Sequence, residues 1–147
     1  MTKIFETENF IVESHDQPEV DRLEGGHIKI SPNIEVEDRT KLTSKQAIEL
    51  MRLTIVTGEA LVNTMAKIGV EIGRINYQDN GNWKPTLHVH IYGRAKNAVM
   101  QKFGTPIIPG HKDEYKPLTD ADVEILEKEI EGALKEDKYS DIVWGLL

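Results

Sequence analysis

One stretch of the sequence decides how the chain is interpreted: Thr86-Leu87-His88-Val89-His90-Ile91-Tyr92-Gly93-Arg94. Apolar and more polar side chains alternate along most of it, which is typical of a β-strand with one buried face. Because successive side chains of a strand point to opposite sides, Leu87, Val89 and Ile91 are predicted to face the core. The other face then carries Thr86, His88, His90 and Tyr92.

The two histidines of this stretch share a face and lie roughly 6.5–7 Å apart along the strand. At that separation one imidazole can act as a nucleophile while the other contacts the same substrate. The same spacing is common in metal sites and also occurs where histidines are purely structural. Spacing alone therefore leaves the catalytic, metal-binding and structural interpretations open.

The clearest helix of the chain is predicted at residues 43–69. It opens with the capping-box pattern Thr43-Ser44-Lys45-Gln46, and apolar residues then recur near helical spacing up to Gly69, the expected stop. Gly58 within this pattern marks either a weak point or a place of close packing. A second helix is predicted after Thr119, which has the side chain of an N-cap.

Strands are predicted on both sides of the long helix. Residues 4–13 indicate one or two short strands with a break near Glu8-Asn9, and residues 27–30 and 70–77 indicate one strand each. Residues 99–116 contain several Gly and Pro residues and are predicted to form a loop. The order of strands, long helix, strands and helix favours an α+β fold with an antiparallel sheet of about five strands, the long helix packed on it.

Composition narrows the class of protein. The chain has 147 residues, so residues 1–147 are expected to form a single domain. Cysteine is absent, which excludes disulfides and thiolate zinc sites. The net charge of −7 disfavours binding along a nucleic-acid backbone but allows a local pocket for a mononucleotide. With no apolar run long enough to span a bilayer and no signal peptide, we expect a cytoplasmic protein that binds neither nucleic acid nor membrane.

The residues that follow the two histidines carry a family resemblance. Together with Gly93-Arg94, the strand resembles the motif of the histidine-triad (HIT) family, His-φ-His-φ-His-φ-φ with Pro or Gly and then Arg shortly after, where φ is apolar. Gly93-Arg94 sets the register, so His90 is the third histidine, His88 the middle one, and Thr86 occupies the first place. The segment Gly26-His27-Ile28-Lys29-Ile30-Ser31-Pro32 is similar to another strand of the family. The likeness covers most of the chain, and it is to bacterial proteins described as diadenosine tetraphosphate hydrolase-like.

The resemblance implies a nucleotide hydrolase or nucleotidyl transferase of HIT-like fold. The family's nucleophile is the middle histidine, so His88 takes that role, with His90 as a supporting catalytic group. The resemblance also implies five substrate-binding residues. Asp16 is assigned to the ribose and Gly81-Asn82 to the phosphate loop, and the other two are Asn76 and Thr86. It implies no cofactor or metal, a nucleotide or dinucleoside polyphosphate as substrate, and a homodimer, for which Leu53 or Val56 is a candidate buried contact.

Two departures from the family pattern keep alternatives open. Thr86 replaces the first histidine, and Glu35 lies near the place of a further family histidine. A nucleotide-binding module with little turnover is therefore one alternative. A metalloprotein that uses His88, His90 and a third ligand is the other, and the candidates for that ligand are His27, Glu35 and His111.

Several other residues are expected to have supporting or structural roles. His27 is expected to hold a loop or strand end, and His111 to be exposed or part of a lid. Trp83 is expected either to pack over the pocket or to fill core space, and Trp144 to anchor the tail by packing. Lys84 and Arg94 can neutralise phosphate charge, or they are a solvated loop lysine and a structural partner for an acidic side chain.

Overall fold

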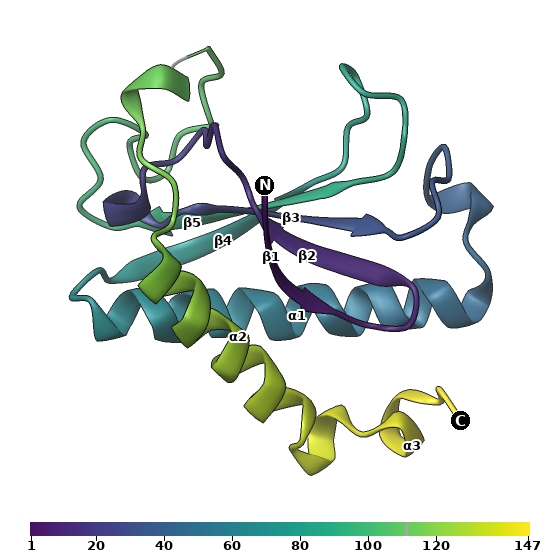
Figure 1. Cartoon of the computed structure of the whole chain (residues 1–147). Coiled ribbons are helices and arrows are strands. Elements are labelled where there is room, and N and C mark those ends of the chain that lie inside the picture. The colour runs from purple at the N-terminus through teal and green to yellow at the C-terminus, as the bar shows by residue number, and fades with distance from the viewer. Residues whose placement is uncertain (111) are drawn as a thin grey trace.

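The computed structural model describes residues 1–110 and 112–147. Its centre is a five-stranded antiparallel sheet in the order β1-β2-β3-β5-β4, with the long helix α1 lying across one face (Figure 1). This confirms the predicted α+β fold. The strands are β1 (Thr2–Glu6), β2 (Phe10–Ser14), β3 (His27–Pro32), β4 (Ile72–Gln78) and β5 (Val89–Ala95). The α-helices are α1 (Ser44–Lys67), α2 (Asp120–Leu134) and α3 (Asp141–Trp144), and short 3-10 helices span Arg22–Glu24, Arg39–Lys41, Lys112–Glu114 and Asp137–Tyr139.

Helix α1 has the predicted ends and the predicted close contact. Thr43 and Gln46 form the complete capping box, and Gly69 follows the helix with a φ of 83°. A Cβ atom at Gly58 would lie 2.3 Å from the hydroxyl of Tyr77, so this glycine lets α1 approach β4 closely. The helix contributes several fully buried side chains to the core, among them Leu53, Val56, Leu61 and Met65.

The break between β1 and β2 is held by a buried carboxylate of α1. Glu49 accepts hydrogen bonds from the Thr7 hydroxyl at 2.8 Å and from the backbone and side-chain nitrogens of Asn9 at 3.1 and 2.9 Å. The hairpin turn is thereby fixed to the first turns of α1, because an unpaired buried carboxylate would be costly.

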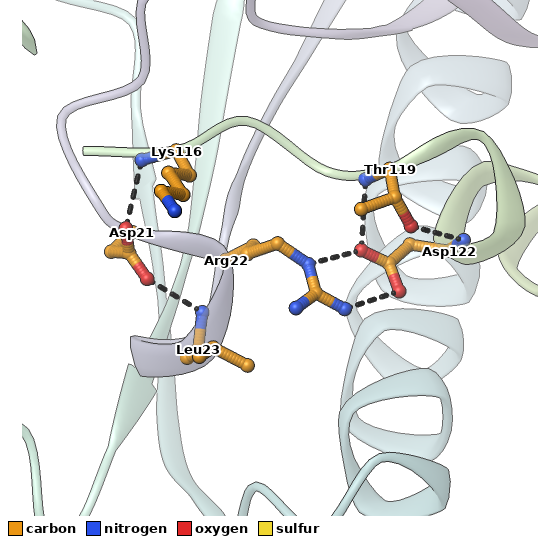
Figure 2. A network of polar contacts seen from close by, with 6 residues as sticks. All are labelled: Asp21, Arg22, Leu23, Lys116, Thr119 and Asp122. Atoms are coloured by element: carbon orange, nitrogen blue, oxygen red, sulfur yellow. Dashed lines mark hydrogen bonds and ion pairs between the residues drawn. The ribbon is translucent and has the colours of Figure 1, made fainter.

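Helix α2 is fastened to the loop that precedes β3 (Figure 2). Thr119 is the N-cap, as predicted, and together with Asp122 it forms a second capping box. Asp122 also accepts two hydrogen bonds from Arg22, at 2.7 and 2.9 Å, and neighbouring Asp21 accepts one from the backbone N–H of Lys116 at 2.8 Å. The segment leading into His27 is therefore anchored from outside the sheet.

At the other end of the chain Trp144 stacks on Tyr139 and packs against the core, as expected of an anchor.

The two ends of β5 are set by its hydrogen-bonding partners in other segments. β5 begins at Val89 because the backbone N–H of Leu87 donates to the carbonyl of Val36, at 2.8 Å, outside the ladder. The strand then continues to Ala95, which pairs with Ile72 of β4. No helix within residues 1–110 and 112–147 is long and apolar enough to cross a membrane.

Candidate active site

The face of the sheet opposite α1 gathers the histidines around the middle of β5. Residues paired across neighbouring strands share a face. His27 of β3 lies opposite Tyr92 of β5, and Gln78 of β4 lies opposite His90. The rings of His88 and His90 are 4.8 Å apart, edge to face, which confirms that the two project on the same side.

The hydrogen bond of His88 determines which of its nitrogens carries the proton. Nδ1 lies 2.7 Å from the backbone carbonyl of Thr86. A carbonyl only accepts, so Nδ1 carries the proton, and in the neutral ring Nε2 holds an unshared electron pair. A histidine nucleophile needs an acceptor of this kind for its other nitrogen, so the geometry is compatible with the role that the resemblance implies for His88.

A second hydrogen bond determines the tautomer of His90. The backbone N–H of Glu19 donates to Nδ1 of His27 at 3.1 Å, so the His27 proton is on Nε2. That Nε2 lies 2.8 Å from Nδ1 of His90 and donates to it. His90 in turn carries its proton on Nε2, which makes this nitrogen a hydrogen-bond donor on the site face.

His90 remains neutral at physiological pH. Burial lowers its pKa to about 4, and positive charge at His88, His15 and Lys29 contributes in the same direction. The ring therefore offers an uncharged N–H rather than an imidazolium.

Stability should fall as pH falls between about 6.5 and 4, in part because of His90. Its pKa is near 6.5 in the unfolded chain and about 4 in the folded one, so between these values only the unfolded state binds the proton. The loss reaches roughly 3 kcal/mol at the lower end and is absent above pH 6.5. His90→Asn keeps an acceptor for His27 and should flatten the curve of unfolding free energy against pH, measured by denaturant titration. An equally steep curve for this variant would show that His90 is not the group that titrates.

The comparisons with known proteins agree with this geometry. A sequence profile described as the HIT domain matches residues 1–97. The chain belongs to the HIT family. Members of the family are generally nucleotide hydrolases or transferases that bind nucleotide substrates.

Solved structures of HIT proteins share the fold. A histidine triad protein from Sinorhizobium meliloti superposes with a TM-score of 0.67 at 17% identity, covering 89% of this chain and 87% of that one. A histidine triad protein from Bradyrhizobium japonicum has a TM-score of 0.65 at 19% identity, covering 87% of this chain and 89% of that one. A hypothetical histidine triad nucleotide-binding protein from Sulfolobus tokodaii has a TM-score of 0.58 at 16% identity, covering 96% of this chain and 87% of that one. Comparison with curated proteins finds no match.

Two residues near His90 were missed by the sequence analysis. His15 stacks on His27 with ring centroids 4.5 Å apart and planes 14° apart, and its ring lies 6.1 Å from that of His90. The pairing of β2 with β3 brings it there, and its signal in the sequence was its place next to Asp16, which the resemblance assigns to the ribose. Gln78 did have a signal, since it follows Asn76 at the spacing that keeps two strand residues on one face.

The residues predicted to bind substrate come from segments on both sides of the histidine cluster. Asn76 is on the site face, opposite Tyr92, and its Oδ1 accepts a hydrogen bond from Arg94 at 2.7 Å. Asp16 is 61% exposed and pairs through Oδ2 with the N-terminal ammonium group. Gly81 turns the loop before β5 with a φ of 66°, and Asn82 is exposed beside it. Thr86 is half-buried and supplies the carbonyl that His88 contacts.

Arg94 does not have either of the roles expected of it. It is 3% exposed and donates to Asn76 and to the backbone carbonyls of Lys102 and Thr105, at 2.9 and 2.7 Å. Its partners are therefore neutral oxygens rather than an acidic side chain, and burial keeps it away from a phosphate. Arg94 instead holds the segment that follows β5 against the sheet.

Trp83 also differs from its prediction, because its side chain is 99% exposed and therefore neither fills core space nor packs on another part of the chain. Lys84 next to it lies 3.7 Å from Glu35, and both side chains are largely exposed. His27 is 2% exposed and has the structural role expected of it.

A metal site has no support in the described part of the HIT chain. Within residues 1–110 and 112–147, no group of three or more His, Cys, Asp or Glu side chains is arranged to hold a metal ion. Two of the three suggested third ligands have other partners, since His27 bonds to His90 and Glu35 pairs with Lys84. The third, His111, lies outside the described residues.

Proposed function

We propose that the chain cleaves a nucleotide from a leaving group through a nucleotidyl-His88 intermediate. The observation that carries this is the hydrogen bond from Nδ1 of His88 to the carbonyl of Thr86, which leaves Nε2 as a nucleophile beside a neutral His90. The substrate class is a nucleotide joined through its α-phosphate to a leaving group, such as a dinucleoside polyphosphate or a nucleoside phosphoramidate. We place this reaction in the cytoplasm.

In the first step the electron pair of Nε2 forms a bond to the α-phosphorus. The bond from phosphorus to the leaving group breaks, and its electrons depart on the leaving oxygen or nitrogen, which takes a proton from solvent. The modified ring becomes positively charged, and the carbonyl of Thr86 stabilises it through Nδ1–H. In the second step water attacks phosphorus, the P–N electrons return to Nε2, and the water proton passes to solvent.

Charge on the phosphoryl oxygens is matched by preorganised donors. The Nε2–H of His90 is one, and backbone N–H groups of the loop at Gly81 and Asn82 are the others. Because His90 is held neutral, these donors act as dipoles rather than as a cation. Their contribution is greatest where water is excluded.

The direct experiment follows nucleoside monophosphate release from diadenosine polyphosphates and from adenosine phosphoramidates. Acid-labile, base-stable attachment of one nucleotidyl group to the peptide that contains His88, seen by mass spectrometry, is expected during turnover. Release without any such adduct, and unaffected by substitution of His88, would reject the mechanism.

A nucleotide-binding module with little turnover is the second candidate, and Thr86 favours it. The threonine replaces an imidazole of the family triad, so one source of protons and positive charge is missing. Tight binding of adenosine nucleotides in calorimetry, together with the absence of product from every substrate of the panel, would select this function.

Asp16 should distinguish ribonucleotides from deoxyribonucleotides. A carboxylate can accept both hydroxyls of a ribose, whereas a deoxyribose offers one of them. Asp16→Ala is expected to weaken AMP binding about tenfold and dAMP binding much less. The measurement is the ratio of the two dissociation constants. An equal loss for both nucleotides would show that Asp16 only supports its turn.

We propose a homodimer that pairs through β4 and the adjoining flank of α1. The sequence suggested Leu53 or Val56 as the dimer contact. That prediction is wrong, because the two side chains are 1% and 0% exposed and lie within the chain's own core. β4 is an edge strand, and its Tyr77 is 47% exposed next to Gly58. Met51, on the same helical stripe as Gly58, is 56% exposed.

Met51→Glu and Tyr77→Glu are expected to convert the dimer to a monomer, because each buries a charge in an apolar contact that symmetry doubles. Light scattering at micromolar concentration measures the mass. Ile142→Glu is the matched control, since Ile142 is 76% exposed and lies on α3 rather than on α1 or β4. A monomeric mass for the unmodified chain would contradict the proposal.

A further inference from the structure

The site face has two ends, and they differ in what they can bind. β3 enters at the Tyr92 end, where His27 pairs with Tyr92. Ser14 pairs with Ile28 at the same end, so Asp16 follows there. At the opposite end Thr86 leads into His88, and the chain before it forms the loop of residues 79–86. A substrate with its ribose at Asp16 and its α-phosphorus at His88 directs its leaving group toward this loop.

The loop of residues 79–86 is clamped to the segment that follows β3. The backbone N–H of Leu87 donates to the carbonyl of Val36 at 2.8 Å. Arg39 reaches Asp79 through Nε at 2.5 Å and through Nη2 at 3.2 Å. Lys84 adds an ion pair to Glu35 at 3.7 Å. Each exposed pair is weak alone, but the three links together hold the two segments side by side.

These two segments display large apolar side chains to solvent. Trp83 is 99% exposed and Ile34 is 80% exposed, and the residues next to them are the ones joined by the Lys84 to Glu35 ion pair. A fully exposed indole on a tethered loop contributes nothing to the core. Its flat ring is instead suited to stacking on another aromatic ring, which every nucleobase provides.

We propose that Trp83 is the stacking platform for the base of the leaving nucleotide. The inference rests on the proposed function, because it uses the α-phosphorus at His88 and the ribose at Asp16 to orient the substrate. It narrows the substrate class to dinucleoside polyphosphates. An adenosine phosphoramidate has no second base, so it gains nothing from Trp83.

Fluorescence titration tests the contact directly, because the chain has two tryptophans. Trp144→Phe leaves Trp83 as the reporter, and Trp83→Phe leaves Trp144 as the matched control. Both are made with His88→Asn so that substrate survives. We expect diadenosine tetraphosphate to quench Trp83, AMP to leave it unquenched, and neither to change Trp144. Equal quenching by AMP would show that Trp83 contacts the base of the retained nucleotide. No quenching by diadenosine tetraphosphate would show that Trp83 does not contact the substrate. Either result overturns the proposal.

Kinetics separates this inference from the proposed function. Trp83→Ala is expected to raise the KM for diadenosine tetraphosphate about tenfold and leave that for adenosine phosphoramidate unchanged. Trp83→Phe should restore most of the loss. Normal cleavage of both substrates by Trp83→Ala overturns the stacking role while the nucleotidyl-histidine mechanism stands. If the unmodified chain cleaves neither substrate, the proposed function is rejected. The fluorescence titration then still tests whether Trp83 stacks on the second base. A change of oligomeric mass in Trp83→Ala, with unchanged kinetics, would assign the indole to a contact between copies and overturn the proposal.

Discussion

His88→Asn is expected to lower turnover by ~10³-fold or more while nucleotide affinity stays within several-fold. The asparagine amide can still donate to the carbonyl of Thr86, so the local backbone is preserved, but no nitrogen with an unshared pair remains. Affinity is retained because it rests on the loop amides and the ribose contact rather than on the nucleophile. Single-turnover product release and equilibrium binding of AMP are the two measurements.

His90→Asn is the matched control for this substitution. It keeps an acceptor for Nε2–H of His27 and removes the donor on the site face, so a loss of about 10²-fold in kcat is expected, less than at His88. If His90→Asn abolished turnover and His88→Asn retained it, the register of the triad would be wrong by one repeat and His90 would be the nucleophile.

Gly93→Ala is expected to destabilise the fold by about 3 kcal/mol and to disturb the site. A Cβ atom at Gly93 would lie 2.3 Å from the carbonyl oxygen of Gly25, which is backbone and cannot rotate away. Gly25 itself has a φ of 131°, a backbone conformation that residues other than glycine rarely adopt. The displaced segment leads directly into His27, which orients His90. Denaturant unfolding measures the stability, and turnover measures the site.

Gly132→Ala is the matched control for Gly93→Ala. Gly132 lies within α2, and a Cβ atom there would meet nothing within 4 Å. Alanine is the better helix former, so a gain of about 0.5–1 kcal/mol is expected. Equal and small effects of the two substitutions would show that the strands tolerate a side chain at Gly93.

Local signals in the sequence were sufficient for the elements and for the pair of catalytic candidates. The hydroxyl and amide of Thr43 and Gln46 specify a helix start through bonds within a few residues, and the structure has that start. The alternation around His88 and His90 places both rings on one face, because parity along a strand needs no knowledge of other segments. Gly93-Arg94 supplied the family register, and the HIT profile confirmed the family.

The partners of these residues were decided only by the tertiary structure. Arg94 was predicted for a phosphate or a carboxylate and instead binds backbone carbonyls of the segment beyond β5, because the fold buries it there. His15 joins the site because β2 and β3 pair, and Leu53 and Val56 face inward only because α1 is covered on the sheet side. The sequence by itself determined the fold class, the helix caps and which strand face carries the histidines, since these depend on neighbours along the chain. Tautomers, burial and the exposure of Trp83 depend on segments far apart in sequence, whose approach is set by packing of the whole domain.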